Sequence, residues 1–425
     1  MSDFKNLFLL IGTNPLPNYV VAKYFIDTNK FLENICFIYS SANTTFHQSS
    51  TIHYAENIAK VLKKNGLNEK INIHYIPVEN IENKQSITNA INTFLSKNVP
   101  SGIIHLNYTG GTKQMGIHSN EFFAGEVFKK HYSVEIETSY LSARNFKLIG
   151  GDDNVICDNL NENVNMIFED LIELHGFKRI NEDKTSHYSG ALKVFEDFIS
   201  SDILDKYYKD YSRLYFEDDN GQLITTFKKA NAQFTDMVIQ GKLLEVSNAF
   251  QEDFKIFDSE GKFKSDLVGT TNEKDSKVKY AIKFFDGDWL EEYVYKILNE
   301  DNEVSKMSPL ANWVIKKPTW TDKLNFELDI LLMNGYQLYG ISCTTSDKIG
   351  MCKSKGFEIL LRTKQIGGDE AKSVLISRLT EENVDKLQLE LETDTGGTGN
   401  ILILGKKDLK KDVLIKKIKK FLKGD

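Results

Sequence analysis

The segment Gly102–Gly116, GIIHLNYTGGTKQMG, gathers residue types that together can hold a phosphate group. An apolar run ends at Tyr108, and a loop with two glycines and two threonines leads to Lys113, where we predict a helix to begin. Backbone N–H groups, hydroxyls and a cation at a helix N-terminus attract anions. The sequence contains neither GxxxxGK[ST] nor GxGxxG, which argues against an NTPase or a dinucleotide-dependent dehydrogenase. A tight turn without a ligand is the alternative.

Carboxylates in the C-terminal part of the chain fall where hydrolysis could use them. Glu327 and Asp329 alternate on a predicted strand, so both point to the same face, and Glu291 and Glu292 lie on a predicted helix. Two acidic side chains on one buried face cost free energy unless a cation compensates them. Mg²⁺ or Mn²⁺ held by oxygen ligands would do so. A solvent-facing edge strand is the alternative.

Histidine is confined to the first half of the chain. All eight histidines lie at or before His187, so chemistry in the C-terminal part cannot use a histidine as acid or base. Cys343 and Cys352 have no histidine partner there, which argues against a nucleophilic role for either. The four cysteines form no CxxC pair, so neither a zinc ribbon nor a disulfide framework is indicated. Metal-assisted hydrolysis by carboxylates and a lysine stays open.

The length of 425 residues predicts two or three domains. No apolar stretch reaches the roughly 18 residues of a membrane span, and the N-terminus lacks the order of a signal peptide, so we expect a cytoplasmic protein. A net charge of −7 argues against a protein coated in nucleic acid. Residues 401–425 nevertheless carry nine lysines against three aspartates on a predicted helix. These lysines form either a solvated helix face or a contact strip for phosphodiesters.

Strands and helices alternate over residues 1–150, which predicts a doubly wound parallel sheet. In such sheets, ligands bind beyond the carboxyl ends of the strands. Three polar loops are expected at that edge, and their convergence predicts a single phosphate-rich site: Gly12–Asn14, Ser40–Asn43 and Thr109–Lys113. The predicted strands are Asn6–Ile11, Ile35–Tyr39, Ile71–Pro77, Ile103–Tyr108, Val134–Leu141 and Lys147–Gly150.

Residues 151–280 are interpreted as a connecting region of helices and short strands, and residues 281–425 as a second α/β unit. The turn Asn334-Gly335 predicts a hairpin between two strands, Phe326–Met333 and Gln337–Cys343. The other predicted elements are a helix over Trp289–Leu298, a helix over Asp369–Leu379, a strand over Asn400–Leu404, and either a strand or a helix over Gly356–Leu361.

The two ends of the chain resemble two domain families that occur fused in type III CRISPR defence. The N-terminal part resembles a CARF domain, a Rossmann-like sensor of cyclic oligoadenylate, and the C-terminal part is similar to the restriction-endonuclease-like PD-(D/E)xK nucleases. The sensor resemblance rests on Gly12-Thr13-Asn14, Ser40-Ser41, Asn107–Met115 and Ser139-Tyr140-Leu141. The nuclease resemblance rests on residues 287–292 and 325–329 and on Gly367-Gly368.

This resemblance implies a homodimer in which paired sensors bind a cyclic oligoadenylate, with cyclic tetra-adenylate the expected ring, and activate cleavage of DNA or RNA with Mg²⁺ or Mn²⁺. Neither ring size nor the choice between DNA and RNA follows from the sequence. The expected activator contacts are Thr13, Asn14, Ser40, Ser41, Thr109, Gly110, Gly111, Thr112 and Lys113. The expected metal ligands are Asp329, Glu327 and Glu291, and the catalytic set adds Glu292, Lys353 and Lys355.

One departure from the nuclease pattern puts catalysis in question. The strand after the metal-binding aspartate usually carries Glu/Asp-x-Lys, but this chain has Ser342-Cys343-Thr344 at that place. Lys353 or Lys355 could replace the missing lysine, and Glu291 or Glu292 could supply the missing carboxylate. A nuclease fold that binds nucleic acid without cutting it is the alternative, and a sensor that slowly cleaves its own activator is a third interpretation.

Overall fold

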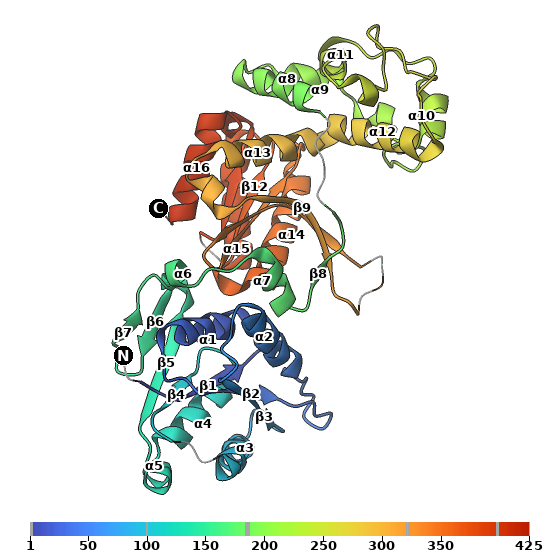
Figure 1. Cartoon of the computed structure of the whole chain (residues 1–425). Helices are drawn as coiled ribbons and strands as arrows, with labels where there is room; N and C mark the ends of the chain where they lie inside the picture. Colours follow the sequence, from blue (N-terminus) through green and yellow to red (C-terminus); the bar gives the residue numbers. More distant parts are fainter. Residues whose placement is uncertain are drawn as a thin grey trace.

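The computed structural model describes residues 3–98, 101–182, 188–319, 321, 324–396 and 399–424. Two α/β units and a helical unit follow one another along the molecule (Figure 1). The first α/β unit, in blue and teal, lies at one end; the second, in orange and red, lies in the middle; the helical unit, in green and yellow, lies at the far end. Within the described residues, no helix combines the length and apolar character needed to cross a bilayer.

The first unit is built on a seven-stranded sheet in the order β3-β2-β1-β4-β5-β6-β7. Strands β1 to β5 run parallel, whereas β6 and β7 are added antiparallel, so the predicted doubly wound sheet is confirmed. The strands are β1 Asn6–Ile11, β2 Asn34–Ser40, β3 Asn72–Val78, β4 Ile104–Asn107, β5 Ile136–Ser142, β6 Lys147–Gly150 and β7 Val155–Cys157. The helices are α1 Leu16–Thr28, α2 Ile52–Lys64, α3 Lys84–Lys97, α4 Lys113–Ala124 and α5 Glu126–Tyr132.

The residues of β1 explain why helices cover both faces of this sheet. All six are buried. Leu7 and Leu9 pack in one apolar cluster with α1 and α2, whereas Phe8 and Leu10 pack in another with α3 and α4. A strand that is apolar on both sides needs a helix layer on each face. Because helices cover both faces of the sheet, a ligand can reach this unit most directly at the ends of its strands.

The second unit has a six-stranded mixed sheet in the order β13-β12-β11-β10-β9-β8. Helices α14 Ile349–Gly367 and α15 Glu381–Thr395 cover one face, and α13 Trp289–Glu300 and α16 Lys411–Lys423 cover the other. The predicted hairpin is present as the antiparallel pair β10 and β11. The strands are β8 Lys178–Arg179, β9 Leu310–Lys316, β10 Phe326–Asn334, β11 Gln337–Cys343, β12 Lys372–Ile376 and β13 Ile401–Leu404.

The helical unit packs on the second unit through aromatic side chains, at the start of α13. Phe195 of α8 stacks on Trp289 with ring centroids 4.1 Å apart, and the Tyr207 hydroxyl donates to the Phe285 carbonyl at 2.8 Å. A π-helical turn, Phe284–Asp288, joins this unit to α13. Its helices are α8 Ser189–Ser200, α9 Leu204–Asp210, α10 Phe227–Phe234, α11 Gly241–Asn248 and α12 Thr271–Lys283.

The predicted helix over Asp369–Leu379 is wrong, because this segment contains the parallel strand β12. Residues Ser373–Ile376 are all buried between β11 and β13, and the short apolar run is read equally well as a buried strand. Gly356–Leu361, for which the sequence left strand or helix open, lies inside α14.

Lysines on α16 form ion pairs with acidic residues of the same unit. Lys411 lies 2.7 Å from Glu300, Lys417 lies 2.7 Å from Asp408, and Lys419 contacts Asp301 at 3.1 Å. Leu414 and Ile418 are buried on the opposite side of this helix. The pairs favour the solvated helix face over a phosphodiester contact strip.

The two α/β units meet at a contact that we call the junction, formed by Asn14 of the first unit and by Tyr336, Gly368 and Glu370 of the second. The short helical turns Ala143–Asn145 and Gly368–Glu370 also pack together here. A Cβ atom placed on Gly368 would lie 2.4 Å from Asn14 Nδ2 and 3.0 Å from Glu370 Oε2. Gly368 has a φ of +75°, so only glycine meets both conditions without strain.

Glu370 is buried at the junction, and its Oε2 atom has no hydrogen-bond partner among the described residues. Burial raises the pKa of Glu370 to about 7; the neighbouring Asp369 adds to the rise, and Lys364 opposes it. The native state therefore holds the proton of Glu370 more tightly than the unfolded chain does.

We expect Glu370→Gln to stabilise the protein at alkaline pH. Because the folded pKa lies above the unfolded one, the parent loses stability as pH rises from about 4.5 to 7, whereas the variant does not. The gain of the variant over the parent should grow by about 2–3 kcal/mol between pH 5 and pH 8. Urea unfolding at both pH values measures it, with the exposed Glu79→Gln as control. Parallel pH profiles for the parent and Glu370→Gln would contradict the assignment.

Candidate functional sites

A cavity of about 420 Å³ lies at the carboxyl ends of β1 and β2, where the sequence predicted a phosphate-rich site. We call it the ligand pocket. Four of the predicted contacts line it, namely Thr13, Ser40, Gly111 and Thr112. Thr112 is also the N-cap of α4, because its hydroxyl accepts a hydrogen bond from the Met115 N–H at 3.2 Å.

The other predicted contacts lie around the ligand pocket rather than in its wall. The Thr109 hydroxyl accepts from the Leu141 N–H at 2.7 Å, and the Ser41 hydroxyl donates to the Val78 carbonyl at 3.1 Å. Lys113 is exposed at the first position of α4. Gly110 lies against β1, and Asn14 lies at the junction.

The wall of the ligand pocket also contains residues that the sequence interpretation missed. They come from the segment between β2 and α2, whose polar run follows directly after a strand end, and that run was the available signal. Thr51 fixes the segment, because its hydroxyl accepts from the Ser40 N–H at 3.0 Å and donates to the Ile11 carbonyl at 3.2 Å. The lining residues from this segment and the first turn of α2 are Phe46, His47, Gln48, Ser49, Ser50, Thr51, His53 and Tyr54, and the loop after β3 adds Asn80, Ile81 and Glu82.

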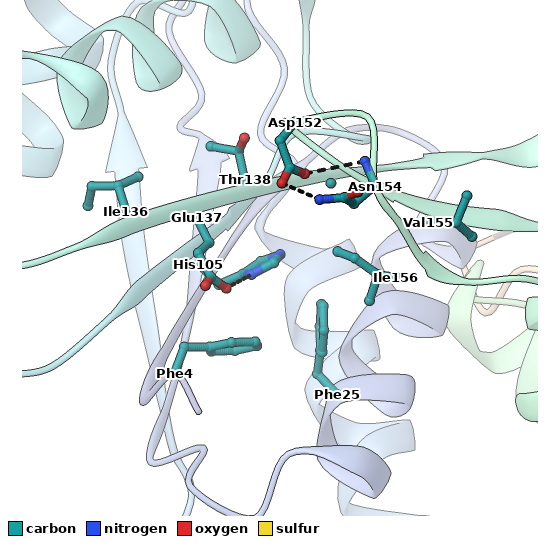
Figure 2. Close-up of a pocket in the computed structure, with 12 residues that line it drawn as sticks. Phe4, Phe25, His105, Ile136, Glu137, Thr138, Asp152, Asn154, Val155 and Ile156 are labelled. Atoms are coloured by element: carbon teal, nitrogen blue, oxygen red, sulfur yellow. Dashed lines mark hydrogen bonds and ion pairs between the residues drawn. The ribbon is translucent and has the colours of Figure 1, made fainter. Parts of the chain in front are cut away.

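A second cavity of about 550 Å³ lies apart from these loops, between β4, β5, α1 and the β6–β7 turn (Figure 2). Its buried polar group is His105, whose ring stacks on Phe4 at 4.6 Å. The His105 Nε2 atom lies 2.7 Å from the Ser139 hydroxyl, and its Nδ1 atom lies 3.4 Å from Glu137. Burial lowers the pKa of His105, which keeps the ring neutral. This polar group is already satisfied, and the cavity lacks the loops that converge on the ligand pocket.

Asp329 of β10 is the centre of the second candidate site, which we call the hydrolytic site. Its Oδ2 atom accepts from the Ser342 hydroxyl at 2.9 Å and from the Cys343 N–H at 2.8 Å. Burial raises the pKa of Asp329, and Glu327 adds to the rise, whereas the two hydrogen bonds and the Lys355 ammonium oppose it. The residues at the expected Glu-x-Lys position therefore hold the aspartate in place.

The structure distinguishes the two helix-borne glutamates. Burial raises the pKa of the Cys343 thiol, and the carboxylates of Asp329 and Glu291 add to that rise, so both act on the same atom. The Glu292 carboxylate instead adds to the rise in the pKa of Tyr188, which directly precedes α8 of the helical unit. The π-helical turn sets this orientation at the start of α13, and the Thr345 hydroxyl fixes the turn by donating to the Asp286 carbonyl at 2.8 Å.

The structure also distinguishes the two candidate lysines on α14. Lys353 forms ion pairs with Glu390 and Asp394 of α15, both at 3.1 Å. Lys355 acts on Asp329 and lowers its pKa, and its ammonium lies 3.5 Å from Glu358. Of the two lysines, Lys355 is therefore the one whose charge acts on Asp329.

The donor set at the hydrolytic site consists of hard oxygen atoms, which suits Mg²⁺ or Mn²⁺. The pKa of Asp329 is raised by burial and further by the negative charge of Glu327. A cation would relieve the repulsion between these two carboxylates. Across the described ranges, no three His, Cys, Asp or Glu side chains gather closely enough to hold a metal ion. The residues present thus fit an ion held by one or two carboxylates, as Mg²⁺ is at sites that also use substrate phosphate.

Family models match both α/β units of the chain. A model described as the Card1 CARF domain matches residues 7–146, and a model described as the Card1-like endonuclease domain matches residues 278–401. The chain is a Card1-like CARF–endonuclease protein. The ligand pocket lies in its CARF domain, and Asp329 lies in its endonuclease domain. No curated protein matches the chain.

Two solved structures share this fold over nearly the whole chain. Can2 from Sulfobacillus thermosulfidooxidans, solved in complex with cyclic tetra-adenylate, is 15% identical with a TM-score of 0.60, covering 97% of this chain and 97% of that one. Protein VC1899 from Vibrio cholerae is 15% identical with a TM-score of 0.61, covering 99% of this chain and 98% of that one. These likenesses establish the two-domain fold of the Card1-like chain.

Gly110 should tolerate no side chain, because the loop that carries it packs directly on β1. A Cβ atom there would lie 2.2 Å from the Leu10 carbonyl oxygen and 2.5 Å from Asn18 Nδ2. We expect Gly110→Ala to lower the free energy of unfolding by about 1–3 kcal/mol. Gly116→Ala is the matched control, since a Cβ on that α4 residue would meet nothing within 4 Å. The control should stabilise the protein by about 0.5–1 kcal/mol, and equal effects of both changes would refute the close approach.

Proposed function

We propose that this chain is a nuclease of type III CRISPR defence that is activated by cyclic oligoadenylate and depends on Mg²⁺ or Mn²⁺. One observation carries the proposal: a single chain joins a CARF domain with a pocket at its strand ends to an endonuclease domain in which Lys355 acts on Asp329. The pocket would receive the activator, and the carboxylate with its lysine would act on a phosphodiester.

Cyclic tetra-adenylate is the activator that the fold favours, because Can2, which shares the fold, was solved with this ring. A pocket of about 420 Å³ has the size of a site for one small ligand, which is less than a ring of four nucleotides needs. Two copies of the chain related by a two-fold axis would offer two such pockets to a ring with repeated phosphates. A homodimer is therefore part of the proposal.

Within the hydrolytic site, each of this chain's residues has a distinct task. Ser342 and Cys343 donate to one oxygen of Asp329, which fixes the carboxylate and leaves its other oxygen for a cation. Glu327 and Glu291 supply further negative charge near the same place. A bound Mg²⁺ or Mn²⁺ would activate water near neutral pH without a histidine. The carboxylates of Asp329, Glu327 and Glu291 would hold this ion.

Lys355 would take the part of the lysine that the strand lacks. An ammonium group close to Asp329 can stabilise the negative charge that develops on the phosphate during attack. Lys355 comes from α14 rather than from the strand, but it would supply the same charged group. Lys353 is occupied by its ion pairs with α15.

Asp329→Ala should abolish cleavage and leave activator affinity unchanged, because the two sites lie in separate domains. The purified protein is incubated with plasmid DNA and with RNA, with and without cyclic tetra-adenylate and Mn²⁺. We expect cleavage only when cyclic tetra-adenylate and Mn²⁺ are both present. Lys355→Ala should lose at least about tenfold in rate, as expected when a charge-assisted contact to the phosphate is removed. Lys353→Ala is the matched control on the same helix and should keep most of the activity.

Cleavage by Asp329→Ala at the rate of the parent would show that the hydrolytic site is misplaced. Activator binding without any cleavage would favour a ligand-responsive nucleic-acid-binding protein with a degenerate nuclease fold. Slow loss of the activator alone would favour a sensor that cleaves its own ligand. Equal cleavage with and without the activator would rule out gating.

Lys113→Ala should weaken binding of cyclic tetra-adenylate by about tenfold or more. Lys113 is exposed at the N-terminus of α4, beside Gly111 and Thr112 of the ligand pocket, where its charge adds to that of the helix end. Calorimetry measures the change, with Lys97→Ala at the far end of α3 as control. An unchanged affinity in Lys113→Ala would remove this residue from the activator contacts.

A further inference from the structure

The loop that closes the ligand pocket also contacts the endonuclease domain, and two adjacent residues divide these tasks. Thr13 lines the pocket. Asn14 lies at the junction, where its Nδ2 atom is 2.4 Å from the position that a Cβ on Gly368 would take. The Asn14 Oδ1 atom accepts from the Leu16 N–H at 3.2 Å, so the side chain is held in this direction by the start of α1. A displacement of the loop by a ligand would therefore move Asn14 relative to Gly368.

Gly368 follows directly on α14, whose opposite half carries Lys355. The helix has 19 residues, which corresponds to a length of about 28 Å. Its C-terminal end is packed closely, since a Cβ on Gly367 would lie 2.8 Å from the Leu338 Cβ of β11. A regular helix held at one end moves as a body, so a shift at Gly368 reaches the residues that face Asp329.

The junction also contains buried polar atoms whose hydrogen bonding could change if the two domains shifted slightly. Glu370 Oε2 and the Tyr336 hydroxyl are both buried without hydrogen-bond partners among the described residues. Buried polar atoms without partners cost free energy, and a small rearrangement that pairs them recovers it. A shift that paired these two atoms would recover part of this free energy, which would favour a second arrangement of the junction.

We propose that Asn14 is a positioning residue that transmits occupancy of the ligand pocket through Gly368 and α14 to Lys355 at the hydrolytic site. This inference rests on the proposed function and names the path of its regulation. Thr13 contributes to affinity and Asn14 to transmission, so substitutions at these two neighbours should have different effects.

The test compares Thr13→Ala, Asn14→Ala and Asn14→Asp in the full-length protein, with cyclic tetra-adenylate as the probe. Asn14→Asp keeps the oxygen that accepts from Leu16 and replaces only the Nδ2 group, so it controls for loss of the α1 start. Two quantities are measured at saturating ligand: the maximal cleavage rate, and the ligand-induced change in hydrogen exchange of the backbone over residues 364–372.

In the parent, the ligand should change exchange at both the 109–113 loop and residues 364–372. Thr13→Ala should need more ligand but reach the parental response and rate. Both Asn14 variants should keep the response at 109–113, lose it at 364–372, and fall at least about tenfold in maximal rate, the effect of losing coupling of ordinary size.

Full responses in the Asn14 variants at saturation, or ligand binding by the parent without any change at 364–372, would overturn the inference while leaving the proposed function standing. A parent that binds the ligand and shows the response at 364–372 but does not cleave would support the transmission path and refute the nuclease assignment. A parent that binds no cyclic tetra-adenylate would overturn both.

Discussion

The close packing of α14 on β11 is the constraint on which the second unit depends. A Cβ atom on Gly340 would lie 2.3 Å from Thr363 Oγ1, and one on Gly367 would lie 2.8 Å from Leu338 Cβ, so glycines on both elements allow the approach. Because a helix at this distance cannot slide over the strand without collision, α14 and β11 keep one mutual arrangement, and the helix moves as a body when it moves. The N-terminal half of α14 carries Lys355, whose charge acts on Asp329, and its C-terminal end leads to Gly368, which contacts Asn14 of the CARF domain.

Under the proposed function, this arrangement would let an endonuclease domain work without the usual lysine on its strand. Asp329 is held by the backbone N–H of Cys343, which any residue but proline would offer there, and by the hydroxyl of Ser342, which a glutamate at this position would lack. The positive charge comes from α14, which crosses the same face of the sheet. In the proposed site, one element therefore fixes the carboxylate and another supplies the lysine.

The CARF domain and the endonuclease domain share one apolar cluster, which includes Leu62 of α2, Phe168 and Trp313. Helix α7 Phe168–Leu174 packs against both α2 and α14. Such continuous packing transmits small displacements because interiors are dense and poorly compressible. The helical unit lies at the opposite end of the endonuclease domain, so the two neighbours of that domain contact different edges of it (Figure 1).

The sequence by itself determined the features that depend on local pattern. The alternation over residues 1–150 predicted the doubly wound sheet, because buried parallel strands and their helices have distinct periods and each is bounded by turn residues. The loop Thr109–Lys113 was predicted from its composition, and Thr13, Ser40, Gly111 and Thr112 do line a pocket at that edge. The order of carboxylates predicted an acidic site around Asp329.

Only the tertiary structure decided the features that depend on which distant elements meet. The segment Asp369–Leu379 is too short for periodicity to separate helix from strand, and burial between β11 and β13 made it a strand. Lys353 and Lys355 are two residues apart and equivalent in sequence, but α15 lies beside one of them only. The contact of Asn14 with Gly368 joins residues 354 positions apart. Such a contact follows from the packing of two domains and leaves no trace in local spacing.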